Sequence, residues 1–173
     1  MAPRSAREQV AQFMARYDPA VAAVARAVLR RLRARLPGAV EIVYDNYNAL
    51  VIGFGPTDRT SEAILSIALY PRWVSLFFLR GAVLPDPERV LKGSGSRVRH
   101  VVLDDAKVLD RPAIRVLIGH ALANSPKPLD AGRVHRMVVK SVSAKQRPRR
   151  PRDVKSARAS SGELGAARRR KSP

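Results

Sequence analysis

Four apolar segments joined by very short linkers occupy the middle of the chain, and they constrain its fold more than any other feature. They are rich in β-branched and aromatic residues, which is typical of strands. Because a parallel crossover needs about a dozen residues or more, linkers this short predict an antiparallel meander. The four segments are VEIVYD (40–45), ALVIGF (49–54), AILSIALY (63–70) and WVSLFFLRG (73–81).

Helical signals precede these strands. Ser5 and Glu8 form a capping-box pattern at the start of a helix predicted over residues 5–17. The dipeptide Asp18-Pro19 then combines a capping residue with a proline at the first helical position. Apolar residues recur at helical spacing up to about Leu36, so we expect a second helix there.

Three further elements are expected after the meander. Residues 97–103 read as a strand, Asp110 as the cap of a third helix, and residues 133–142 as a possible last strand. The predicted fold class is therefore α+β. Two N-terminal helices and one later helix pack on a mainly antiparallel sheet of about five strands.

The last part of the chain differs in composition. Residues 145–173 hold 11 basic and 2 acidic residues, a net charge of +9 out of +19 for the whole chain. Their apolar content is too low to fold alone. We expect a domain at residues 1–144 and a disordered basic tail at 145–173.

Such a tail attracts polyanions, and nucleic acid is the commonest one in a cell. Contacts from arginines to phosphate carry no base readout. One hypothesis is therefore a nucleic-acid-associated accessory protein that binds the phosphate backbone. Its candidate contacts are Arg147, Arg149, Arg150, Arg152, Arg168, Arg169, Arg170 and Lys171.

The composition excludes several classes of protein. The chain has no cysteine, which excludes disulfides, thiolate metal sites and a cysteine nucleophile. No apolar run approaches the roughly 18 residues of a membrane helix. The start of the chain also lacks the apolar stretch of a secretory signal. We expect a soluble, cytoplasmic protein without a membrane partner.

The segment KGSGSRVR (92–99) raises the question of a phosphate-binding loop. In such a loop a helix follows the glycines and presents free N–H groups to the anion. Here a strand-like run follows, and the Walker and dinucleotide spacings are both missing. We interpret the segment as a flexible turn that enters a strand. A basic turn that contacts an anionic ligand is the alternative.

Residues around this turn carry a resemblance to a known family. LFFLRGAVLPDPERVLKGSGSRVRHVVL (76–103), DRPAIRVLIGHAL (110–122) and EIVYDNY (41–47) resemble the bacterial YdhG-like domain family, a domain of unknown function. The resemblance covers roughly residues 10–123. It implies a small α+β domain with helices against an antiparallel sheet. Some relatives are described as iron-handling chaperones similar in shape to frataxin.

Metal and catalytic chemistry are not predicted from the residues. Iron and hard cations need clustered carboxylates, or carboxylates with histidine, and the acidic residues here are scattered. His100, His120 and His135 fall on different predicted elements, without a nucleophile at a recognisable spacing. We expect no cofactor, no metal site and no enzymatic activity. An uncharacterised enzyme is a further alternative.

The leading hypothesis is a non-enzymatic module that binds a small ligand or a protein partner. Polar residues at the end of the first strand form either one wall of a cleft or an ordinary Asn-rich turn. The aromatic residues Trp73, Phe77 and Phe78 are expected in the core. The ligand-binding candidates are Tyr44, Asn46, Tyr47, Arg80, Lys92, Arg97 and Arg99.

Overall fold

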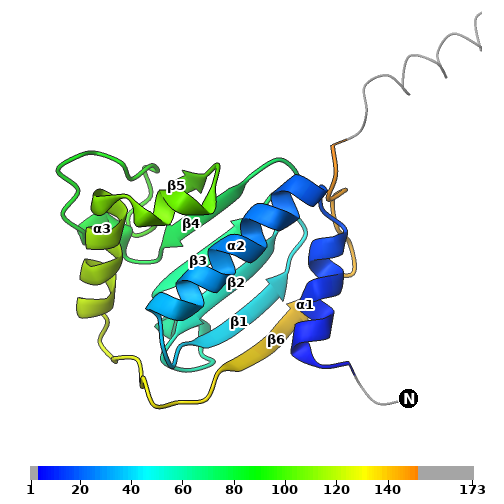
Figure 1. Ribbon diagram of the computed structural model, residues 1–173, viewed down its shortest axis with the longest axis horizontal. Helices are drawn as coiled ribbons and strands as arrows, with labels where there is room; N and C mark the ends of the chain where they lie inside the picture. Colours follow the sequence, from blue (N-terminus) through cyan, green and yellow to red (C-terminus); the bar gives the residue numbers. More distant parts are fainter. Residues whose placement is uncertain (1–3, 152–173) are drawn as a thin grey trace, which may run out of the picture.

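A computed structural model describes residues 4–151 of the chain. The fold class is α+β, as predicted, with two helices before the sheet and one after its fifth strand (Figure 1). No helix in this described range is long and apolar enough to cross a membrane. The elements are α1 (Ala6–Ala15), α2 (Pro19–Arg35), β1 (Val40–Asp45), β2 (Leu50–Gly55), β3 (Leu65–Leu69), β4 (Val74–Phe78), β5 (Arg99–Leu103), α3 (Pro112–Ala123) and β6 (Arg136–Val142), with short 3-10 helices η1 (Thr60–Glu62), η2 (Gly81–Val83) and η3 (Ala106–Asp110).

The sheet has six strands in the order β5-β4-β3-β2-β1-β6. Strands β1 to β5 form the predicted antiparallel meander. Strand β6 returns to the opposite edge and pairs with β1 in parallel, which makes the sheet mixed. The segment that contains α3 supplies the long crossover that a parallel pair needs.

The local signals at the starts of α1 and α2 predict the observed caps. Ser5 and Glu8 form the capping box of α1, and the Asp18 side chain accepts from the Ala20 N–H at the start of α2. The predicted cap of the third helix was wrong. Asp110 instead ends η3 and pairs with Arg31 and Arg35 of α2, so that it joins two elements.

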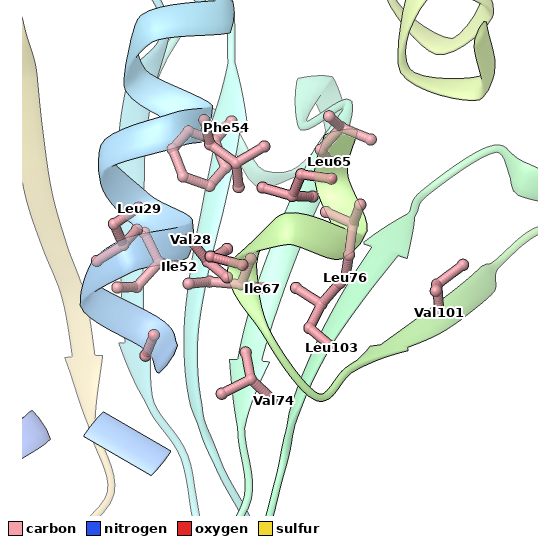
Figure 2. Packing of buried hydrophobic residues seen from close by; sticks show 14 of the residues in the cluster. Val28, Leu29, Ile52, Phe54, Leu65, Ile67, Val74, Leu76, Val101 and Leu103 are labelled. Carbon is pink, nitrogen blue, oxygen red and sulfur yellow. The ribbon is translucent and has the colours of Figure 1, made fainter. Parts of the chain in front are cut away.

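Helix α2 covers one face of the sheet and forms the core with it (Figures 1 and 2). Val28 and Leu29 of α2 lie over Ile52 and Ile67, which are completely or almost completely buried. Alternate residues of each strand point to this face. Burial of this apolar face supplies most of the driving force for folding.

Strand β1 places two carboxylates on the same helix-covered face. Glu41, Val43 and Asp45 alternate along the strand, and their cross-strand partners include the core residues Ile52 and Leu50. Glu41 is 1% exposed and Asp45 is 0% exposed. Buried carboxylates need cationic or hydrogen-bonding partners, and both have arginines beside them, as described below.

The end of the described chain packs on the domain beyond residue 144, the boundary expected from the sequence. Ser143 and Arg147 donate backbone hydrogen bonds of 2.9 Å to the carbonyl oxygens of Asp45 and Tyr47. Arg149 is buried against the domain. The packed part of the chain therefore includes residues beyond 144, because one arginine of the basic segment is used as an internal ion-pair partner. The rest of the predicted tail, from Arg152 onward, lies outside the described residues.

Candidate functional site

The predicted ligand cleft does not assemble as one site. The cross-strand row of Asp45, Leu50, Leu69, Val74 and Leu103 marks one end of the sheet. The predicted candidates divide between this end and the opposite one. Asn46 and Tyr47 follow the row, whereas Arg80, Lys92, Arg97 and Arg99 lie at the other end, where Phe78 pairs with Arg99.

Tyr44 belongs to neither group. Its hydroxyl forms a hydrogen bond with the Thr60 hydroxyl in η1. The Tyr44 side chain and the Val43 side chain lie on different faces of the sheet, because neighbouring residues of a strand point to opposite faces. The structure therefore gives Tyr44 a partner in the loop between β2 and β3.

Two hairpin turns come together at the Asp45 end of the sheet. The first follows β1, where the Asn46 N–H donates to the Ala49 carbonyl at 2.9 Å. The second joins β3 to β4, where the Tyr70 N–H donates to the Trp73 carbonyl at 2.9 Å. The Asn-rich segment is thus a hairpin turn, one of the two forms expected from sequence.

These turns and the C-terminal segment line an open groove of about 850 Å³, here named the aromatic–basic groove. Its wall combines aromatic rings, amides and arginines, and none of the described residues that line it is acidic. The lining residues are Asn46, Tyr47, Asn48, Ala49, Val51, Tyr70, Pro71, Arg72, Trp73, Arg147, Pro148, Arg150 and Pro151.

Two aromatic residues of this groove are unusually exposed. Trp73 is 44% and Tyr47 is 52% exposed. The Trp73 ring stacks on Tyr70, with 4.9 Å between ring centroids and 24° between planes. Of the three aromatics expected in the core, Phe78 is fully buried and Phe77 partly buried. The expectation was wrong for Trp73, because Pro71 and Arg72 place it at an exposed hairpin end.

Arg149 fixes the basic segment beside these turns. Its guanidinium donates to the Asp45 carboxylate at 2.8 Å and also to the Asn46 and Tyr47 carbonyls. It lies over the Tyr17 ring, 5.5 Å from the ring centroid. Arg16, at the C-terminal end of α1, pairs with the other carboxylate oxygen of Asp45. Arg149 is therefore a structural residue, because its guanidinium is buried and ion-paired with Asp45.

The arginines near Arg149 in the sequence remain at the surface. Arg147 and Arg150 are exposed, and both line the groove together with Arg72. Arg150 donates to the Tyr17 and Ala15 carbonyls at the end of α1, which orients its guanidinium without neutralising it. Of the predicted nucleic-acid candidates, Arg147 and Arg150 therefore have no acidic partner among residues 4–151, and Arg152 and residues 168–171 lie outside the described part of the chain.

The glycine segment at the opposite end is a turn that enters a strand, as we interpreted it. Lys92 and His100 exchange backbone hydrogen bonds of 2.8 and 2.9 Å, and β5 begins at Arg99. The Arg99 guanidinium donates to the carbonyls of Gly95 and Val98, so it closes the turn. Contact of this turn with an anionic ligand stays a prediction.

A second polar cluster surrounds Glu41. Arg33 donates two hydrogen bonds to the carboxylate, at 2.6 and 2.9 Å, and the His135 Nε2 lies 2.7 Å from Glu41 Oε1. Arg7 contacts the other ring nitrogen of His135 at 3.3 Å. Burial opposes ionisation of Glu41, but the hydrogen bonds from Arg33 and His135 outweigh it and lower the pKa of this carboxyl. The cluster joins α1, α2, β1 and the residue that precedes β6.

This cluster resembles a carboxylate–histidine pair, but within residues 4–151 no reacting partner lines the space beside it. The adjacent hollow has a volume of about 390 Å³, and none of the described residues that line it carries a hydroxyl or thiol. A nucleophile would need to lie within hydrogen-bond reach of the imidazole. The geometry therefore explains the cluster as an ion-pair network that holds the edge strand.

Arg80 lines a different, smaller hollow between η1 and the end of α3. Its volume is about 150 Å³, below the roughly 300–1,000 Å³ of typical small-molecule sites. Among the described residues, no group of three or more histidine, aspartate or glutamate side chains is placed to hold a metal ion. The aromatic–basic groove is consequently the better candidate site.

The sequence contained signals for the residues that were missed. Tyr70-Pro71-Arg72-Trp73 interrupts two apolar strands, which is the pattern of an exposed hairpin end. Alternation along residues 40–45 puts Glu41 and Asp45 on the face of Val43. Their arginine and histidine partners come from distant segments, and no local pattern identifies them.

Comparison of this chain with protein-family models, with curated proteins and with solved structures gave no match.

Proposed function

We propose that this protein is a non-enzymatic, YdhG-like module that binds nucleic acid. The aromatic–basic groove and the basic segment that continues from it form the binding surface. The proposal combines the two hypotheses drawn from the sequence, a binding module and a phosphate-binding basic tail. It places their common site where the two hairpin turns meet residues 147–151.

The observation that carries the proposal is the position of Arg147 and Arg150 on either side of the buried Arg149. The Arg149–Asp45 ion pair holds this segment against the β1–β2 turn, and Arg72 faces the same groove from the β3–β4 turn. Three guanidinium groups without an acidic neighbour in the lining produce a positive local potential. Such a surface attracts a polyanion and releases its counterions.

The shape of the groove favours an extended ligand. It is open and crosses two turns and the C-terminal segment, whereas small-molecule sites enclose most of their ligand. Further basic residues, Arg152, Arg168, Arg169, Arg170 and Lys171, follow along the chain. These charges add to the attraction of the chain for a polyanion.

The test uses the full chain, because residues 146–150 are part of the packed unit and a truncation at residue 144 would disturb it. Fluorescence anisotropy would measure the affinity for a labelled 20-nucleotide DNA at two salt concentrations. We expect Arg72→Ala/Arg147→Ala/Arg150→Ala to lower the affinity about tenfold at low salt. Replacement of residues 168–171 by alanine tests the contribution of the distal charges.

A matched control removes three exposed arginines elsewhere, Arg26→Ala/Arg30→Ala/Arg115→Ala, and so changes the net charge equally. If this control weakened binding as much as the groove variant, only the total charge would matter and the groove would be the wrong site. Binding to vesicles of anionic lipid with none to DNA or RNA would overturn the proposal as a whole.

A further inference from the structure

The exposure of two aromatic rings in the groove is not explained by attraction of phosphate. Trp73 and Tyr47 come from different hairpin turns, and both are about half exposed. Large aromatic side chains are costly to expose and are enriched at binding sites. Phosphate contacts need only the arginines, so the rings require a second type of contact.

The geometry of Trp73 is suited to stacking. Tyr70 packs against one face of the indole at 4.9 Å and so holds the ring in a fixed orientation. Trp73 nevertheless stays 44% exposed, so Tyr70 does not cover it completely. A rigid, half-covered ring of this kind can accept a planar group at little cost in side-chain entropy.

The arrangement of charge around the rings matches a nucleic-acid strand. Arg72 precedes Trp73 in the same turn, and the Arg147 guanidinium donates to the Asn48 side chain next to Tyr47. The aromatic residues thus share the lining of one groove with these arginines. Sites for single-stranded nucleic acid combine stacking rings with a basic path for the phosphates in this way.

We propose that the aromatic–basic groove binds single-stranded nucleic acid, with unpaired bases stacked on Trp73 and Tyr47 and phosphates on Arg72, Arg147 and Arg150. This inference rests on the proposed function and specifies its ligand. A duplex keeps its bases stacked on one another, so it can use the arginines but not the rings. Every base has a π-face, so the groove binds with little sequence preference.

Trp73 is the only tryptophan of the chain, so its fluorescence reports on the site directly. The full-length protein would be titrated with a 12-nucleotide oligothymidylate, a 12-base-pair duplex and inorganic polyphosphate of similar charge. We expect the single strand to quench Trp73 fluorescence and to bind about tenfold more tightly than the duplex. Polyphosphate should bind without comparable quenching.

Three variants test the rings themselves. Trp73→Ala should weaken binding of the labelled oligothymidylate about tenfold, Tyr47→Ala by a smaller factor, and Trp73→Phe should retain most of the affinity. Affinity for polyphosphate should be unchanged in all three. Both positions lie at exposed turns, and the quenching of the unmodified protein gives an answer that does not depend on how any variant folds.

The two proposals fail in different ways. Equal binding of all three ligands without quenching would overturn base stacking and leave the phosphate-binding function intact. Tighter binding of the duplex than of the single strand would also overturn base stacking. No binding of either nucleic acid at low salt would overturn both the inference and the proposed function.

Discussion

The Arg149 guanidinium donates a hydrogen bond of 2.8 Å to the Asp45 carboxylate, and the two residues are 104 positions apart in the sequence. Their side chains are 3% and 0% exposed. The pair joins the end of β1 to the last described residues and so determines where the basic segment lies. Its disruption should therefore affect both stability and the shape of the groove.

Arg149→Ala should lower the free energy of unfolding by about 3 kcal/mol. The change leaves the buried Asp45 carboxylate with Arg16 as its remaining cation, and removal of one partner from a buried ion pair is strongly destabilising. Urea unfolding at pH 7 would measure the loss. The Arg147 amide, which donates to the Tyr47 carbonyl, should also exchange its hydrogen faster.

Arg150→Ala is the matched control, because it removes an exposed arginine from the same segment and should cost less than about 1 kcal/mol. If both variants unfolded at the same urea concentration, the Asp45–Arg149 pair would not stabilise the fold in the way that its burial indicates.

Glu41→Gln should lose stability in a pH-dependent manner. Because the pKa of Glu41 in the folded protein lies below its ordinary value of 4.5, ionisation stabilises the fold above that pH. The stabilisation declines as the pH falls through the lower folded pKa. We expect a difference of about 1.5–3 kcal/mol between the two proteins at pH 7, which disappears in acid.

Thermal unfolding of the unmodified protein and the Gln variant between pH 7 and pH 3 would measure this difference. Because the other carboxylates titrate in both proteins, their effect cancels in the difference between the two unfolding free energies. A difference that stayed constant over the whole range would show that the ionised form of Glu41 contributes nothing to stability.

Gly38→Ala should destabilise the protein by more than about 3 kcal/mol. Gly38 has a φ of +76°, and a Cβ atom there would lie 1.6 Å from the Asp130 carbonyl oxygen. The backbone conformation alone costs an L-residue about 1–3 kcal/mol, and the clash forces the loop before β6 to move. Chemical unfolding would quantify the loss.

Gly95→Ala provides the comparison. Nothing lies within 4 Å of a Cβ atom at Gly95, and its φ is not in the left-handed region. We expect stability within about 0.5 kcal/mol of the unmodified protein. A large loss at Gly95 would mean that the basic turn needs its glycine for more than flexibility.

The groove arginines should also set the salt dependence of binding. For a single strand, each lost phosphate contact reduces the slope of log affinity against log salt by about 0.7. Arg72→Ala/Arg147→Ala should therefore reduce the slope by about 1.4. Titrations of the oligothymidylate at four salt concentrations would determine it. Unchanged slopes would exclude direct phosphate contacts by these two side chains.

Much of the fold followed from local patterns. The capping box at Ser5, the Asp18-Pro19 start and the short linkers between apolar runs each involve residues close in sequence, so elementary rules apply to them. The α+β class and the antiparallel meander were predictable for this reason. The Asp110 cap was mispredicted because tertiary ion pairs with Arg31 and Arg35 compete with local capping.

The candidate site was less predictable. Asn46 and Tyr47 were identified as site residues, and both line the groove. Trp73 was assigned to the core because an aromatic residue next to an apolar strand is usually buried. Arg80, Lys92, Arg97 and Arg99 were grouped with Tyr47 although the register of the sheet separates them.

By itself, the amino-acid sequence determined the element types, the meander and the excess of positive charge, since these depend on periodicity, linker length and composition. Only the tertiary structure decided that β6 pairs with β1, that Arg149 is ion-paired inside the domain and that Trp73 lines the same groove as Tyr47 and three arginines. These relationships join segments up to about a hundred residues apart. Their energies depend on burial and distance, which no local pattern encodes.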